Sequence, residues 1–219
     1  GILVLAGWAI GSPFLKNLGP GFIAMTPNAA LAFILISGAL SWLSFKKQTR
    51  FTQRMAVACA FAVIVIDGLA TTEYLLGWDS GFDQWLFQES PESLGPWLPN
   101  RMGLNTALCL TLFGSALLLN RSEAKNTRHY LREALTLGGL FIAFIAFLGY
   151  GYNEHSLYGI GQYTPMALHT SLTLLIAGVG ILFLHPDRGL MAVAMSDQAG
   201  GHMLRRLLPG ILLFLPAIG

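Results

Sequence analysis

One seven-residue pattern occurs three times in the chain and begins a long apolar run each time. The pattern is methionine, two residues, asparagine or histidine, two small residues and leucine, and its copies occupy residues 25–31, 102–108 and 166–172. A small residue follows the polar position at the same offset in each run, as Ser37, Gly114 and Gly178. Such regular repetition predicts one structural unit used three times. We therefore expect three tandem helix-pair repeats that start near residues 25, 102 and 166.

The apolar runs have the length that a lipid bilayer requires. Hydrophobic residues make up 54% of the chain and charged residues only 11%, about half the charged fraction of an ordinary soluble domain. Several runs reach about 18 to 25 mostly apolar residues, which crosses about 30 Å of hydrocarbon as an α-helix. The sequence therefore predicts an all-α polytopic membrane protein, with one integral-membrane domain over residues 1–219.

Capping signals and breakers divide this domain into about seven transmembrane helices. We expect them near residues 1–11, 26–45, 53–78, 101–120, 132–150, 164–185 and 201–219. Thr26-Pro27 and Thr164-Pro165 have the N-cap and first-turn proline of a helix start. Residues 187–200 are expected to form a loop or a surface helix. The abrupt apolar start and the direction of the last helix lead us to expect further sequence, including an eighth helix.

The basic residues predict the orientation of the domain. Of its 13 lysines and arginines, all except Lys16 and Arg101 fall on one side of the predicted helices. By the positive-inside rule that side is cytoplasmic, so the basic loops are cytoplasmic and all three methionine phrases lie at the outer end. The basic residues occupy short loops and do not gather on one face, so they do not indicate a nucleic-acid partner.

Polar residues at the predicted outer end form the candidate ligand site. Asn28, Asn105 and His169 hold the same repeat position, and packing around a pseudosymmetry axis would bring them together at one depth. Glu73 ends a helix at that depth and should pair with Arg101, the only arginine on that side. The loop and the connection that we expect to cover this site contribute Asp83, Gln84 and Tyr158. The alternative is a structural role, in which the repeated polar residues only tie the repeats together through hydrogen bonds.

The ligand class follows from the expected surroundings of the site. A mostly apolar pocket with a few polar groups suits a quinone or another lipid-soluble ligand. Five histidines leave a b-type haem as an alternative, with His169 as the first ligand. Asp67 lies deeper, where an ionisable residue is a functional candidate by default and a protonated or hydrogen-bonded structural group otherwise. The chain contains no Gly-x-Ser-x-Gly, His-Glu-x-x-His, Walker A or Cys-x-x-Cys motif, so no catalytic residue is predicted.

Several segments in combination resemble a known family. They are EYLLGWDSGFDQWLF at 73–87, NRMGLNTALCL at 100–110, SLYG at 156–159, MALHT at 166–170 and SDxxGGxxxRRLLP at 196–209. They resemble the N-terminal integral-membrane region of bacterial sensor proteins, in which such helices precede PAS, histidine-kinase or GGDEF output domains.

The resemblance implies a sensory input module in the bacterial inner membrane that relays a signal to a cytoplasmic kinase or diguanylate cyclase. It also implies a homodimer formed through that output domain. No output domain is present in this sequence, so any enzyme activity would belong to a missing domain. The alternatives are a non-catalytic accessory subunit of a larger membrane complex and a b-type haem protein.

Overall fold

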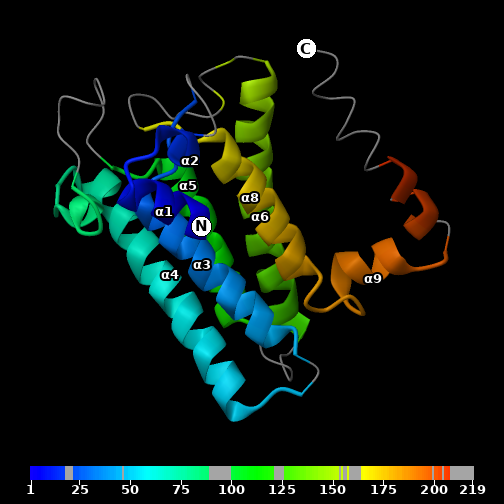
Figure 1. The fold of residues 1–219 in the computed structure, drawn as a ribbon. Helices are drawn as coiled ribbons and strands as arrows, with labels where there is room; N and C mark the ends of the chain where they lie inside the picture. Colours follow the sequence, from blue (N-terminus) through cyan, green and yellow to red (C-terminus); the bar gives the residue numbers. More distant parts are fainter. Residues whose placement is uncertain are drawn as a thin grey trace.

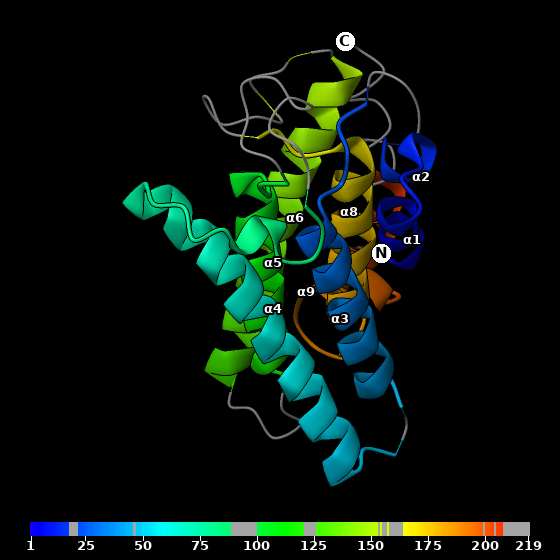
Figure 2. The ribbon, with the colours of Figure 1, turned by 60° about the vertical axis from the view of Figure 1, so that its left-hand side comes forward.

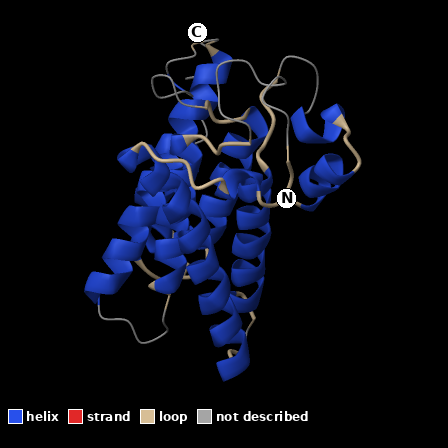
Figure 3. Cartoon of the chain, turned by 90° about the vertical axis from the view of Figure 1, so that its left-hand side faces the viewer, coloured by secondary structure: helices blue, strands red, loops and turns tan. Residues whose placement is uncertain are grey.

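The computed structural model describes residues 1–17, 22–45, 47–88, 100–120, 126–152, 154, 157, 164–198, 200–203 and 205–207. Within these residues all regular structure is helical and no strand occurs (Figure 3). The predicted all-α class is therefore confirmed for the described part of the chain.

The helices form one antiparallel bundle with a smaller helix at its side (Figure 1). The elements are α1 (Ile2–Ala9), α2 (Pro13–Asn17), α3 (Pro27–Leu43), α4 (Arg50–Leu76), the 3-10 helix η1 (Phe82–Gln84), α5 (Leu104–Leu118), α6 (Asn126–Gly151), α8 (Leu168–Leu182) and α9 (Gly189–Met195). The methionine phrases lie at one end of this bundle, which we call the phrase end. The α3–α4 turn and the start of α6 lie at the other, the basic end (Figure 2).

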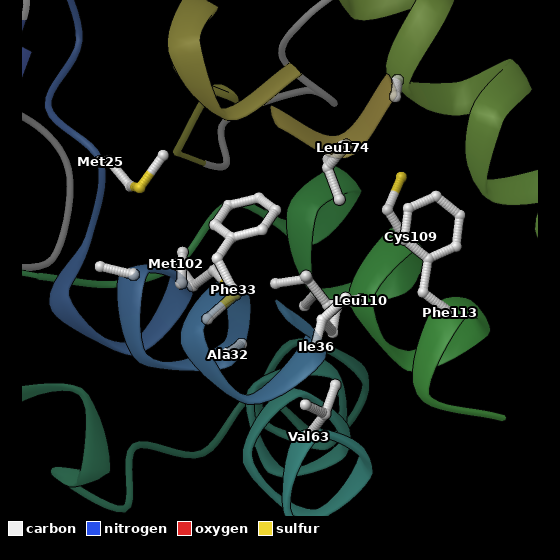
Figure 4. Close-up of a cluster of buried hydrophobic side chains, with 14 of the residues drawn as sticks. Met25, Ala32, Phe33, Ile36, Val63, Met102, Cys109, Leu110, Phe113 and Leu174 are labelled. Carbon is white, nitrogen blue, oxygen red and sulfur yellow. The ribbon is translucent and has the colours of Figure 1, made fainter. Parts of the chain in front are cut away.

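The three helices that follow the methionine phrases occupy the centre of the bundle. α3, α5 and α8 contact one another, α4 packs against α3 and α5, and α6 packs against α5 and α8. Phe33, Leu110 and Leu174, each five residues after the polar position of its repeat, are all buried in the shared core (Figure 4). The three sequence repeats therefore supply equivalent positions of one core.

Each phrase also follows the same backbone path into its helix. The N-cap residues Thr26, Gly103 and Ala167 have φ values of −69°, −59° and −69° and ψ values of 151°, 140° and 148°. The methionine that precedes each N-cap is at most 2% exposed. A buried apolar side chain directly before the N-cap fixes how the chain enters a helix. The phrase is thus a repeated helix start.

An aromatic side chain from an earlier helix donates a hydrogen bond to the methionine carbonyl of each phrase. The bonds are Trp8 Nε1 to Met25 O at 3.0 Å, Tyr74 Oη to Met102 O at 2.6 Å and Tyr150 Oη to Met166 O at 2.7 Å. The three donors lie on α1, α4 and α6. These bonds join α3 to α1, α5 to α4 and α8 to α6, and these are the repeated structural pairs.

Small residues allow two of these pairs to approach closely. A Cβ at Gly114 would lie 3.1 Å from the Ala60 carbonyl oxygen of α4, and one at Gly178 would lie 2.6 Å from Leu140 of α6. Small residues at helix crossings are typical of helices that pack in membranes. Ser37 holds the same repeat position but is exposed. α1 packs beside the first half of α3, and Ser37 lies in the second half.

Some predicted boundaries are wrong. α6 begins at Asn126 and not near Arg132, so Arg128 and Arg132, which were expected in or at the end of a basic loop, belong to its first turns. α8 begins at Leu168, because the helix starts from the methionine phrase and the Thr164-Pro165 pair precedes it. A short helix, α2, replaces part of the loop expected near Lys16. Of the loop or surface helix expected over 187–200, the structure shows a helix, α9, at Gly189–Met195. Of the helix expected over 201–219, residues 201–203 and 205–207 are helical, and the remainder lies outside the described residues.

Two helices among the described residues are long and apolar enough to cross a membrane. They are Arg50–Leu76 and Thr127–Gly151, and only 28% of the most apolar window of each is buried inside the molecule. The core helix of a soluble protein would be mostly buried. α3, α5 and α8 are also apolar, but they have 17, 15 and 15 residues, fewer than the roughly 20 of a typical span. Helix length therefore does not support the predicted count of seven spans.

Candidate functional site

The polar cluster at the phrase end is built where the end of α4, the segment around η1 and the start of α3 meet. α4 ends at Gly77, whose φ of 66° is the left-handed conformation that closes many helices and that glycine adopts without strain. The chain then turns back, and η1 places Asp83 beside the first turn of α3. Residues from two repeats thus contribute to one cluster.

Glu73 and Arg101 form the predicted ion pair. Glu73 Oε2 lies 3.8 Å from Arg101 Nη2, and the Glu73 side chain is almost completely buried. The amide of Ser80 donates to the other carboxylate oxygen at 3.1 Å, and the Ser80 hydroxyl donates to the same oxygen. A buried carboxylate needs such partners to offset its lost hydration. The prediction of this pair is confirmed.

Arg101 also connects the cluster to the repeated aromatic bonds. Its guanidinium lies 4.6 Å from the ring centroid of Tyr74 and donates to the Trp78 carbonyl at 3.3 Å. Lys16 stacks in the same way over the Trp8 ring, at 3.7 Å. Cation–π contacts of this kind stabilise two of the three aromatic side chains that hold a methionine carbonyl. The two basic residues predicted at this end therefore make the same kind of contact in two repeats.

Asp83 is a second buried carboxyl group in the cluster. It accepts a hydrogen bond from Asn28 Nδ2 at 3.3 Å and is 5% exposed. Burial, and after it the negative charge of Glu73, raise the pKa of Asp83 to about 7, although Arg101 and the hydrogen bond from Asn28 oppose the increase. A pKa near 7 makes the charge of Asp83 sensitive to pH in the neutral range.

Asn105 and His169 begin the other two phrase helices, and His169 lies outside this set of contacts. No contact among the described residues joins His169 to Glu73, Asp83 or Arg101. His169 is half-buried, and both of its ring nitrogens are buried without a hydrogen-bond partner in the described part of the chain. Asn105 is buried at the start of α5.

The axis between the phrase helices is lined by other residues than predicted. A small cavity of about 10 Å³ lies there, and its lining includes Ala29, Thr106 and Thr170. Each of these follows the polar residue of its repeat by one position, and the polar residues themselves are not among the lining. Asn28 instead turns toward η1. The structure therefore does not bring Asn28, Asn105 and His169 together on the axis as predicted. At each helix start, the small residue that follows the polar one packs toward the axis instead.

The remaining two predicted site residues add little to the geometry. Gln84 is half-buried in η1 next to Asp83. Tyr158 lies outside the described residues.

A second polar cluster, at the basic end, was not predicted. Arg132 Nη1 donates to Asn120 Oδ1 at 2.8 Å, and His185 Nε2 lies 2.7 Å from the same oxygen. An amide oxygen only accepts, so His185 donates from Nε2. Burial and the positive charges of Arg132 and Arg188 lower the pKa of His185 to about 4, so it is neutral at pH 7. The one feature of the sequence that pointed to this cluster was the position of His185 and Arg132 at expected helix ends.

This basic-end cluster also anchors α9. Glu133 Oε1 accepts the backbone amide of Leu190 at 2.5 Å, and its other oxygen lies 3.9 Å from His129 Nε2. Arg132 Nη2 lies 3.3 Å from His129 Nδ1. Since arginine only donates, His129 Nδ1 accepts and the imidazole is held in one orientation. These contacts tie α9 to α6.

Metal ligation finds no support among the described residues. No group of three or more histidine, cysteine, aspartate or glutamate side chains that could hold a metal ion occurs in the part of the chain that the structure describes. His129 and His185 are engaged by Arg132 and Asn120 at the end of the bundle opposite His169.

Comparisons with protein-family models, curated proteins and solved structures find no match to this chain. The function is therefore argued from the two polar clusters and the surface around them.

Proposed function

We propose that the chain is a membrane-embedded sensory input module of the bacterial inner membrane. The surface of the bundle supports the membrane location, because apolar side chains recur along one face of α4 and of α8. These exposed residues are Val57, Phe61, Val65 and Leu69 on α4, and Leu172, Ile176, Val179 and Phe183 on α8. Water-soluble monomers rarely expose apolar stripes of this length. The basic end is cytoplasmic in this proposal.

The proposed topology is polytopic even though the central helices are short. α3 packs against α4, α8 packs against α6, and α5 packs against both. A helix packed against a spanning helix shares its depth in the bilayer. The extended backbone of each phrase is tolerated there, since protein and not lipid surrounds it. We therefore infer that these three helices also cross the membrane.

The observation that carries the sensory proposal is the buried pair of carboxyl groups, Glu73 and Asp83, that shares Arg101. Two negative charges in one buried cluster repel each other, whereas a proton on Asp83 removes the repulsion. The hydrogen bond from Asn28 makes the docking of η1 on α3 depend on this charge. The cluster therefore has two charge states, and a switch requires that its contacts differ between them.

The input favoured by this geometry is protonation. The cluster residues bind one another, and the cavity on the axis has room for about one water molecule. It is too small for the ring of a quinone, the ligand expected from the sequence. The 27-residue α4 starts at the basic end and ends in the cluster, so it is the proposed relay to a cytoplasmic kinase or cyclase domain outside this chain.

Spin-label distances measured on the whole chain in lipid nanodiscs test this proposal. On a background with Cys59 and Cys109 changed to alanine, one label pair at residues 85 and 22 reports on η1, and a second at residues 48 and 128 reports on the basic end. We expect both distances to change between pH 5.5 and pH 8. Asp83→Asn should abolish both changes, because an amide cannot titrate but still accepts the hydrogen bond from Asn28.

Asp79→Asn is the matched control, since Asp79 is exposed and lies four residues from Asp83. This variant should keep both pH-dependent changes. A change at η1 without one at the basic end would contradict the relay. Identical distances at the two pH values would contradict protonation as the input.

A further inference from the structure

A groove of about 820 Å³ opens at the basic end between α4 and the ends of α3 and α5. Its lining includes Arg50, Gln53, Arg54, Val57 and Phe61 from α4. Apolar residues at the end of α5, among them Leu118, form the opposite wall. This groove is remote from the phrase end, and of the basic-end cluster only Asn120 lines it.

The groove changes from cationic to apolar along the axis of α4. Arg50, Arg54, Val57 and Phe61 are spaced three or four residues apart, so they lie on one face of the helix. At a rise of 1.5 Å per residue, Phe61 lies about 10 Å along the axis from Arg54. The arginines therefore mark one end of the groove and the exposed Val57 and Phe61 side chains mark the other.

We propose that this groove binds an anionic phospholipid, with the phosphate at Arg50 and Arg54 and an acyl chain along Val57 and Phe61. The proposal rests on the proposed membrane location with the basic end at the cytoplasmic surface. The groove then lies parallel to the lipids of the inner leaflet, and its arginines lie at headgroup depth.

Charge complementarity identifies the occupant. None of the described lining residues is acidic, and two guanidinium groups next to an amide side chain offer several donors to a phosphate. The N-terminus of α4 adds the positive end of a helix dipole on the same side. A free phosphate would leave the apolar half of the groove exposed, and a neutral hydrocarbon chain would leave the arginines without a partner. A phospholipid occupies both halves.

Native mass spectrometry of the detergent-purified chain tests the proposal with defined lipids. Palmitoyl-oleoyl phosphatidylglycerol and the phosphatidylcholine with the same chains are added at equal concentrations. We expect the wild-type chain to retain the phosphatidylglycerol selectively. The double variant Arg50→Gln/Arg54→Gln should lower its affinity for this lipid about thirtyfold, as loss of two basic residues at a lipid surface predicts.

Two further variants distinguish loss of the lipid site from a general change in charge and from misfolding. Arg128→Gln removes an exposed arginine from the first turns of α6 at the same end, and it should leave lipid selectivity unchanged. Arg50→Lys/Arg54→Lys keeps both charges and should keep most of the binding. Equal retention of the two lipids, or equal losses in the Arg128 and Arg50/Arg54 variants, would overturn the proposal. A dimer that forms without lipid and dissociates when Phe61 is changed to serine would instead assign the groove to a second copy of the chain.

Carbonate extraction of cell membranes distinguishes failure of this inference from failure of the proposed function. A chain that remains in the membrane pellet but shows no lipid selectivity rejects only the lipid site. A chain released into the supernatant rejects the membrane module itself, and the groove proposal with it.

Discussion

The charge of Asp83 is sensitive to pH near neutrality. Its carboxyl group is buried beside Glu73, and only one arginine compensates for the two acids. A folded-state pKa of about 7 lies well above the value of about 3.9 for an aspartate in an unfolded chain. The folded protein therefore holds a proton that the unfolded chain releases.

The stability of the protein should consequently fall as pH rises. Below about pH 4 both states are protonated at Asp83, and between about pH 4 and 7 only the unfolded chain loses the proton freely. The free energy of unfolding that Asp83 contributes is thus present at low pH and lost through this window. We expect the thermal midpoint in detergent to fall between pH 5 and 8, and to fall less in Asp83→Asn. An Asp83→Asn protein with the wild-type pH dependence would rule out this carboxyl group as its source.

Asp67 is a buried acid of another kind, since neither of its carboxyl oxygens has a hydrogen-bond partner among the described residues. The equivalent position in another repeat shows which kind of residue the fold accommodates at position 67. Asp67 lies seven residues before Tyr74, and Ala143 lies seven residues before Tyr150, the equivalent donor on α6. Ala143 is completely buried as well. A small apolar residue therefore suits this position, and the carboxyl group of Asp67 costs stability.

Exchanging these two residue types should change stability in opposite directions. Asp67→Ala removes a buried group without partners, so the free energy of unfolding should rise by about 1–3 kcal/mol. Ala143→Asp creates such a group and should lower it by a similar amount. Unfolding in mixed micelles with increasing sodium dodecyl sulfate measures both values. A loss of stability in Asp67→Ala would show that the carboxyl group has a stabilising role.

At the scale of elements, the crossing of α5 with α6 and α8 depends on the ring of Phe113. A Cβ at Gly139 of α6 or at Gly178 of α8 would collide with this ring or its neighbours. Cys109 Sγ also lies 3.4 Å from the Gly139 carbonyl oxygen. The absence of two side chains on neighbouring helices therefore creates the space in which one aromatic ring packs.

Adjacent glycines on α6 provide a matched test of this crossing. Gly139→Ala places a methyl group against the Phe113 ring, and overpacking of this kind costs about 1–3 kcal/mol. Gly138→Ala meets only Leu112 at 3.7 Å, so it should be neutral or should stabilise the helix by up to about 1 kcal/mol. Thermal midpoints of the two variants give the comparison, and equal midpoints would contradict this packing.

For the whole molecule, the exposed apolar faces and the two polar ends lead to one proposed arrangement across the membrane. Cysteines introduced at Lys47 and Arg128 should react with a membrane-impermeant maleimide only after the cells are opened, because the proposed topology places the basic end in the cytoplasm. A cysteine at Ser80 should react in intact cells. All three should be made in the background with Cys59 and Cys109 changed to alanine. Labelling of positions 47 and 80 from the same side would refute the topology.

Much of the architecture was predictable because it depends on local chemistry. The repeated phrase indicated three equivalent helix starts, and composition indicated helices with apolar surfaces. The Glu73–Arg101 pair followed from an acid at the end of a helix and the only arginine expected at that end. The start of α6 was misplaced, because basic residues in a first helical turn read as loop when only their charge is considered.

The sequence by itself determined the helical class, the repeat and the chemistry available at each end, since these depend on residue type and spacing along one chain. Only the tertiary structure decided which side chains meet. It turned Asn28 toward Asp83, placed Ala29, Thr106 and Thr170 around the axis, and joined Asn120 to both Arg132 and His185. The physical reason is that helix rotation and loop path set these contacts, and both depend on the packing of all the repeats together.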